Sequence, residues 1–183
     1  FIVGYRISPE EIHDTVGYTW HESTQLIRAI TDQFDLDYIH LSMPQYNGKP
    51  ADSDKTFAEL FAPAIGDQAK EMIVGNLMTE EDMQDALKQT DLVALARATL
   101  MDPQIGLKIA EGRGYEIIHE ISPAQVKAAH LTPGLVSIFS DPKMEPHLPG
   151  RESIYSLHEG VELGEDVIKN GTGSSYNLED FDD

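Results

Sequence analysis

Short apolar runs alternate with amphipathic segments over the first 112 residues, and this alternation constrains the fold more than any other feature of the chain. The apolar runs, each of a length suited to a buried strand, lie at residues 2–7, 38–42, 71–75 and 91–95. Segments with helical spacing of apolar residues follow them, at residues 20–33, 56–68, 79–88 and 102–112. Such an alternation predicts an α/β fold with a parallel sheet. Four strand–helix units fit a small open sheet or half of an eight-stranded barrel.

Several helix boundaries are marked by single residues. Thr79 is predicted to be an N-cap, because the acidic residues 80–82 that follow it suit the first turn of a helix. Asp102 is predicted to cap the fourth helix, with Pro103 in its first helical position. Pro63 is expected to kink or split the helix in which it lies.

The rest of the chain is less regular. Residues 8–18 are expected to form a polar loop or turn, and residues 113–183 no longer alternate. Within the latter, Ser122 and Thr132, each followed by proline, are predicted to begin two further helices. Residues 150–183 are expected to form an acidic peripheral tail, since they end in NLEDFDD.

Composition excludes several classes of function. The chain of 183 residues carries a formal net charge of −19 and no cysteine. An acidic chain repels nucleic acids and anionic membranes, and no apolar run approaches the roughly 20 residues of a membrane helix. We therefore expect no nucleic-acid or membrane partner, and a cytoplasmic location. Without cysteine there is no disulfide or thiolate site, and the histidines lack metal-ligand spacing, so no metal site is assigned.

The chain begins abruptly with an apolar strand, which leads us to expect a fragment of a longer protein.

Candidate binding residues lie where the predicted strands end, which is where parallel α/β proteins place their sites. Arg6 lies one residue before the end of the first run, Gly75 is the last residue of the third and Asn76 follows it, and Ala96-Arg97 follows the fourth. A guanidinium group together with free backbone N–H groups can hold a phosphate, and glycine lets the backbone approach a ligand. These residues therefore predict a phosphate site.

Each of these residues also has a purely structural explanation. Arg6 could form a buried ion pair with an acid, Arg97 could form a surface salt bridge, and Gly75-Asn76 could be a tight turn. His40, inside the second run, is expected to be a packed, hydrogen-bonded histidine rather than a catalytic group.

Three motifs in order carry a family resemblance. GYRISPEE, YIHLSMP and IVGNLMTEEDMQDALKQTDLVALARATLMDP, at their observed spacing, resemble the C-terminal half of the Old Yellow Enzyme family of FMN-dependent NAD(P)H oxidoreductases and ene-reductases. The resemblance implies that residues 1–112 form strands five to eight of a TIM (β/α)₈ barrel, a (βα)₄ half. It also implies that residues 113–149 are the closing helices of a helical C-terminal extension.

The resemblance further implies roles for five residues. Arg6 would contact the pyrimidine edge of the flavin, and Gly75, Asn76, Ala96 and Arg97 would hold the FMN phosphate. Position 96 is usually glycine in the family, so alanine weakens binding only if this residue requires a positive φ. The family residues that orient substrate and donate a proton belong to the first four strands, so no catalytic residue is assigned and the chain alone is expected to be inactive.

The implied reaction passes a hydride from NAD(P)H through FMN to a small-molecule acceptor such as an activated alkene. One alternative is a phosphate-binding TIM-barrel lyase or isomerase, although that class would require a lysine or carboxylate at a strand end. Another is a non-enzymatic acidic interaction module that binds no ligand. An isolated half barrel would leave two apolar edge strands exposed, near residues 2–7 and 91–95. We therefore expect a homodimer or higher oligomer.

Overall fold

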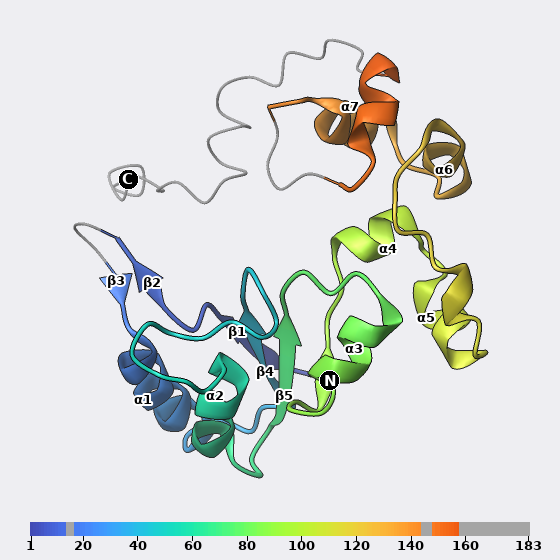
Figure 1. The fold of residues 1–183 in the computed structure, drawn as a ribbon. Helices are drawn as coiled ribbons and strands as arrows, with labels where there is room; N and C mark the ends of the chain where they lie inside the picture. The colour runs from blue at the N-terminus through green and yellow to red at the C-terminus, as the bar shows by residue number, and fades with distance from the viewer. Residues whose placement is uncertain (14–16, 144–147, 158–183) are drawn as a thin grey trace. The chain divides into compact units, whose positions relative to one another are not determined.

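The computed structural model describes residues 1–13, 17–143 and 148–157 (Figure 1). The chain divides into two compact units, and the boundary falls between His119 and Glu120, somewhat beyond the expected end of the half barrel. Each unit is described by itself. None of the helices in these described ranges is both long and apolar enough to cross a membrane.

The first unit is built on a four-stranded sheet whose strands lie in the order β1–β4–β5–β6. These strands are β1 (Gly4–Ile7), β4 (Tyr38–Ser42), β5 (Lys70–Val74) and β6 (Leu92–Val93). All three neighbouring pairs are parallel. The prediction of an α/β fold with a parallel sheet is therefore confirmed, with β1 and β6 at the two edges.

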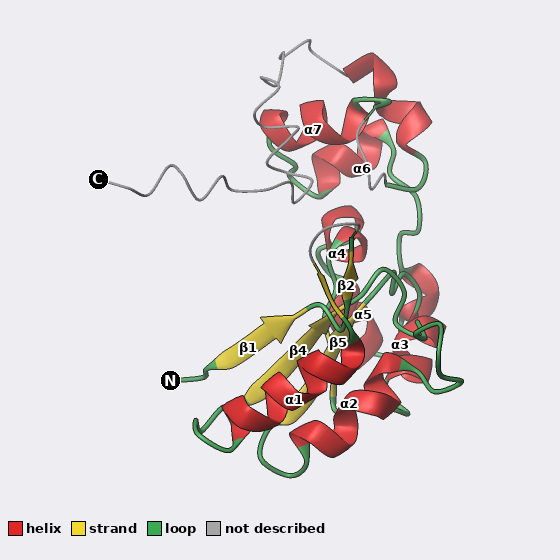
Figure 2. Ribbon diagram, turned by 90° about the vertical axis from the view of Figure 1, so that its left-hand side faces the viewer, coloured by secondary structure: helices red, strands yellow, loops and turns green. Residues whose placement is uncertain are grey.

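The helices that connect the strands begin at capping threonines. These helices are α1 (Trp20–Thr31), α2 (Phe57–Ile65) and α3 (Glu80–Ala86), and each is preceded by a threonine in a capping box. Figure 2 shows α1 and α2 lying against one face of the sheet. Pro63 lies inside α2, which nevertheless forms one uninterrupted helix, so the expected split does not occur.

The core lies between this face of the sheet and the helices. Since side chains alternate along a strand, the residues Ile7, Leu41 and Ile73, which are in register, share one face. All three are buried and pack with Ile27 of α1 and Phe61 of α2. The opposite face carries the residues in register with Arg6, namely His40, Met72 and Leu92.

Residues 8–18 contain a small antiparallel pair rather than the expected loop. It consists of β2 (Glu11–Ile12) and β3 (Gly17–Tyr18), and the residues between them include 14–16, which lie outside the described ranges. Gly17 allows the two strands to approach, because a Cβ atom there would clash with the Glu11 carbonyl oxygen at 2.2 Å. The expectation of a loop was wrong because two-residue strands leave no periodic pattern.

The fourth predicted helix is divided differently. The helix α4 (Arg97–Met101) precedes Asp102, and α5 (Ile105–Ala110) follows Gln104 as its N-cap. Asp102 is thus not the N-cap that its sequence context indicated. Its carboxylate is buried and accepts hydrogen bonds from Lys108 Nζ at 2.6 Å and from the Ile118 N–H at 3.0 Å.

The short 3₁₀ helix η1 (Gly114–Glu116) is the last element of the first unit. The second unit contains the helices α6 (Pro123–Ala128) and α7 (Pro133–Ser140) and the 3₁₀ helix η2 (Arg151–Leu157). Ser122 and Thr132 cap α6 and α7, as the sequence predicted. Ile154 of η2 is fully buried, so the start of the segment expected to be a peripheral tail packs within this unit. The remainder of that segment, residues 158–183, lies outside the described residues.

Candidate functional site

The candidate site lies at the carboxyl ends of the parallel strands, which share one edge of the sheet. Arg6 is the penultimate residue of β1. Gly75 and Asn76 directly follow β5, and Ala96 and Arg97 begin α4 after β6. Since β5 and β6 are neighbours, the structure brings the two predicted phosphate-binding loops together.

Hydrogen bonds join three of these loops through side chains. Arg97 Nη2 donates to Asn76 Oδ1 at 2.8 Å, and Asn76 Nδ2 donates to Gln45 Oε1 at 3.3 Å. The Gln45–Asn76–Arg97 cluster therefore connects the loop after β4, the loop after β5 and the first residue of α4. Gln45 was not predicted, although a polar residue just after the end of a parallel strand is a signal that could have found it.

Asn76 and Gly75 serve the geometry of this cluster. Asn76 has a φ of 50°, in the left-handed region that asparagine tolerates better than most residues. A Cβ atom on Gly75 would lie 2.5 Å from the backbone of Gln45 and Tyr46. Tyr46 N–H donates to the Gly75 carbonyl at 2.8 Å, which fixes this approach. The tight-turn explanation thus accounts for the glycine, and Asn76 is the residue that orients Arg97.

Ala96 has a negative φ. It is the N-cap of α4, with φ −125° and ψ −82°. A positive φ, the condition under which alanine would weaken a phosphate site, is absent at this position. The replacement of the usual family glycine by alanine therefore does not place alanine at a positive φ.

Arg6 is held by a serine. Its Nη2 donates to Ser42 Oγ at 2.6 Å, from the next strand. Arg6 is exposed, so it does not form the buried ion pair that was the structural alternative. Its charge remains available at the open face of the sheet.

His40 lies beside Arg6 in register. Burial, and then the positive charge of Arg6, lowers the pKa of His40, so the imidazole is neutral at neutral pH. Within the described part of the chain, its buried Nε2 atom has no hydrogen-bond partner, so the expected hydrogen bond is not formed there.

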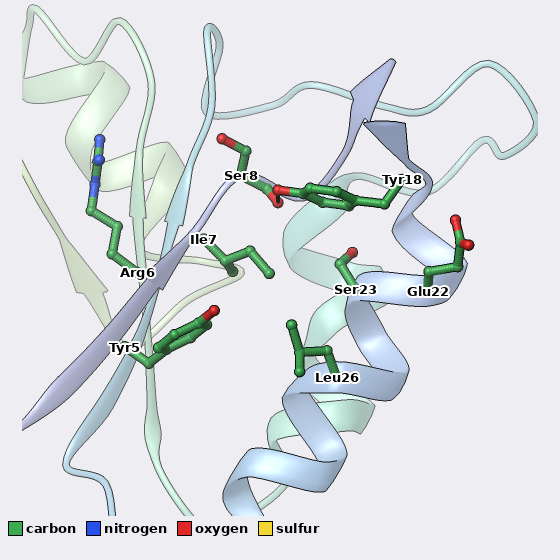
Figure 3. A pocket seen from close by; sticks show the side chains of 8 residues that line it. All are labelled: Tyr5, Arg6, Ile7, Ser8, Tyr18, Glu22, Ser23 and Leu26. Atoms are coloured by element: carbon green, nitrogen blue, oxygen red, sulfur yellow. Dashed lines mark hydrogen bonds between the residues drawn. The ribbon is translucent and has the colours of Figure 1, made fainter. Parts of the chain in front are cut away.

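A cavity of about 470 Å³ lies between β1 and α1 (Figure 3). Tyr5, Ser8, Tyr18 and Leu26 are among its lining residues. Figure 3 shows that the side chain of Arg6 points away from Tyr5 and Leu26. Its guanidinium group therefore lies on the opposite side of β1 from these two side chains. None of the Gln45–Asn76–Arg97 cluster lines this cavity. Arg6 is the one predicted site residue that lines this cavity, and Gly75, Asn76, Ala96 and Arg97 do not.

The chemistry of the edge favours an anion. Two guanidinium groups, each oriented by a neutral polar side chain, lie at the ends of the strands. The described ranges contain no group of three or more histidine, cysteine or acidic side chains that could hold a metal ion. A guanidinium group is a typical binding partner of phosphate, because its N–H donors match the oxygen geometry of that anion.

The fold defines a parallel α/β protein with Arg6 and Arg97 at the carboxyl edge of its sheet. Comparisons with known proteins show what the chain is similar to. The chain is 34% identical over 135 residues to the Bacillus subtilis protein named "Probable NADH-dependent flavin oxidoreductase YqiG", a match that covers 72% of this chain and 36% of that protein. It is 24% identical over 136 residues to "Uncharacterized oxidoreductase SpyM50865" of Streptococcus pyogenes, covering 70% and 34% of the two chains. The resemblance to NADH-dependent flavin oxidoreductases is thereby confirmed for this stretch.

The extent of these matches is limited. The chain spans about a third of the length of the two relatives. No protein-family model matches it. Among solved structures, histamine dehydrogenase from Rhizobium sp. 4-9 aligns with 63% of this chain and 18% of its own, at a TM-score of 0.48 and 17% identity.

Proposed function

We propose that this chain is the C-terminal (βα)₄ half of the barrel of an FMN-dependent NAD(P)H oxidoreductase. Four parallel strands in sequential order support the half-barrel assignment, as does the relation to a flavin oxidoreductase. The observation that carries the proposal is the bond of 2.8 Å between Arg97 and Asn76, because it joins the two loops that were assigned to the FMN phosphate. The whole protein would pass a hydride from NAD(P)H to a small acceptor such as an activated alkene.

The residues present fit the phosphate of FMN. Arg97 is half-buried and held by Asn76, so little side-chain entropy is lost when it binds an anion. The first backbone N–H groups of α4, which have no acceptor within the helix, can add further donors. Gly75 contributes indirectly, by letting the loop after β4 bring Gln45 to Asn76.

Arg6 fits the other end of the cofactor. Ser42 orients its guanidinium group on the open face of the sheet, where it can donate to the electron-rich edge of a flavin. FMN supplies the hydride-transfer chemistry when bound, while the fixed charge of Arg6 favours negative charge on the ring. Since no acid–base residue is assigned, we expect the chain alone to be inactive.

The test is a titration of FMN fluorescence with the purified chain, using riboflavin as the ligand without phosphate. FMN fluorescence should be quenched and that of riboflavin should not. Arg97→Ala should weaken FMN binding by about 10- to 100-fold, because a hydrogen bond to a charged group contributes roughly 1.5–3 kcal/mol. Arg28→Ala removes the same charge from an exposed position of α1 and should leave the affinity unchanged. Equal quenching by riboflavin, or unchanged binding in Arg97→Ala, would contradict the assignment.

The edges of the sheet suggest how the isolated chain associates. β1 and β6 are the edge strands, and the apolar residues Ile2 and Leu92 beside or within them are 78% and 40% exposed. We propose that a second copy of this chain pairs along β1, since unpaired strand edges template association. Light scattering should show a mass above one chain, lowered by Ile2→Lys. A mass of one chain at high concentration would exclude the pairing.

A further inference from the structure

A second cavity lies at the amino-terminal end of β5, whereas the Gln45–Asn76–Arg97 cluster is at the carboxyl end of the strands. Its volume is about 250 Å³. One wall is apolar and comes from the end of α2, with Ala62 and Ile65. The other wall is polar and includes Glu71 and Asp91. The volume is several times the roughly 30 Å³ share of a water molecule, so a small organic molecule fits.

Glu71 gives this cavity an unsatisfied acceptor. The residue is 4% exposed and is paired in register with the buried Ile39, so it lies on the helix-covered face of the sheet. Its Oε1 atom is buried and has no hydrogen-bond partner among residues 1–13, 17–143 and 148–157. A buried carboxylate without a donor is unfavourable by several kcal/mol, and a ligand with N–H groups would remove this cost.

The surroundings of Glu71 favour a positively charged donor. Asp91 lies beside it, and its carboxylate accepts the Glu71 N–H at 3.0 Å and Lys70 Nζ at 2.9 Å. The C-terminal end of α2, the negative pole of a nine-residue helix, forms the apolar wall. Lys70 is exposed and engaged by Asp91, and the exposed Asp67 adds negative charge near it. An ionised Glu71 therefore faces an environment with net negative charge.

We propose that this cavity binds a small alkylammonium ion, whose N–H groups donate to Glu71 and whose alkyl group contacts Ala62 and Ile65. A hard metal ion fits less well, since Ca²⁺ takes six to eight oxygen ligands and the described residues hold no cluster of three or more acidic or histidine side chains. The site lies apart from the flavin residues, so it does not depend on the proposed oxidoreductase function.

The proposal is tested by isothermal titration of the purified chain with methylammonium chloride at pH 8.5. Tetramethylammonium, which has the same charge and no N–H group, is the matched ligand. We expect saturable binding of methylammonium alone, weakened at least tenfold in Glu71→Gln. Asp54→Asn removes an acidic charge at an exposed position that does not line this cavity, and should change the affinity less than twofold. Similar binding of the two ions, no saturable binding of methylammonium, or full binding by Glu71→Gln would overturn the proposal.

A pH series on the unmodified chain tests the proposal without any variant. Burial, and then the charge of Asp91, raises the pKa of Glu71 to about 8. The ammonium ion binds the ionised carboxylate, and a primary ammonium stays charged over this range, as lysine does. Affinity should therefore rise by roughly 50- to 100-fold between pH 6 and pH 8.5, at tenfold per unit below the pKa. An affinity that is flat over this range would refute the role of Glu71, whether or not the variants fold.

Discussion

Replacing Glu71 with glutamine should remove most of the loss of stability that the folded chain suffers as the pH rises. The pKa of Glu71 is raised from 4.5 to about 8 by burial and by Asp91. Between these two values the folded state keeps a proton that the unfolded state has released. Stability is therefore complete below about pH 4.5 and falls as the pH rises through 8. At 1.36 kcal/mol per unit, the difference between 4.5 and 8 corresponds to about 5 kcal/mol.

Urea unfolding followed by circular dichroism at pH 5, 7 and 8.5 measures this effect. Glutamine has nearly the shape of a protonated glutamate and does not titrate, so the two proteins should be similar at pH 5. At pH 8.5 the Glu71→Gln chain should be more stable than the original by about 3–5 kcal/mol, a large part of the 5–15 kcal/mol of a typical domain. Glu120→Gln, at an exposed position with no ion pair among the described residues, should have the stability of the original chain in each measurement. If Glu71→Gln and the original show parallel pH profiles, Glu71 is not an unpaired buried acid and the reasoning fails.

Further expectations concern stability at neutral pH, measured as urea midpoints. Lys108→Met should lower the free energy of unfolding by about 3–5 kcal/mol, because it leaves Asp102 charged and buried without its partner at 2.6 Å. Lys88→Met, at an exposed ion pair, should cost less than about 1 kcal/mol. Gly75→Ala should destabilise by about 1–3 kcal/mol, since its Cβ atom would lie 2.5 Å from the backbone of the loop after β4. Gly106→Ala meets no atom within 4 Å in α5 and should instead stabilise by up to about 1 kcal/mol.

Much of the sheet could be predicted because its elements leave strong local patterns. The buried strands β4 and β5 read as apolar runs bounded by turn residues, and they form within one residue of the predicted limits. Thr79 and Thr132 cap helices as predicted, since capping depends on contacts only three residues away. The sequential strand order is the common arrangement in parallel sheets, in which consecutive strands are usually neighbours.

The elements that were not predicted depend on distant partners or are too short to show a period. The hairpin of β2 and β3 has two residues in each strand. Asp102 has the local sequence of an N-cap, yet its carboxylate is taken by Lys108 and by the backbone of Ile118. Nothing in the sequence near Asp102 reveals that Ile118 returns to it, so local reasoning assigned the wrong start to the helix.

In the candidate site, too, local sequence indicated individual residues, whereas the contacts between distant residues were not predicted. Arg97 could be assigned to the site from the sequence because it follows a predicted parallel strand. The hydrogen bonds of Asn76 to Arg97 and to Gln45 could not be predicted, because they span 21 and 31 positions. Glycine at 75 and alanine at 96 had both been considered for their effect on a ligand. In the structure, the glycine at 75 makes room for the neighbouring loop, and the alanine at 96 has a negative φ that does not require glycine. In the proposed phosphate site, Arg97 is therefore placed by side-chain contacts such as its bond to Asn76 rather than by backbone freedom at position 75 or 96.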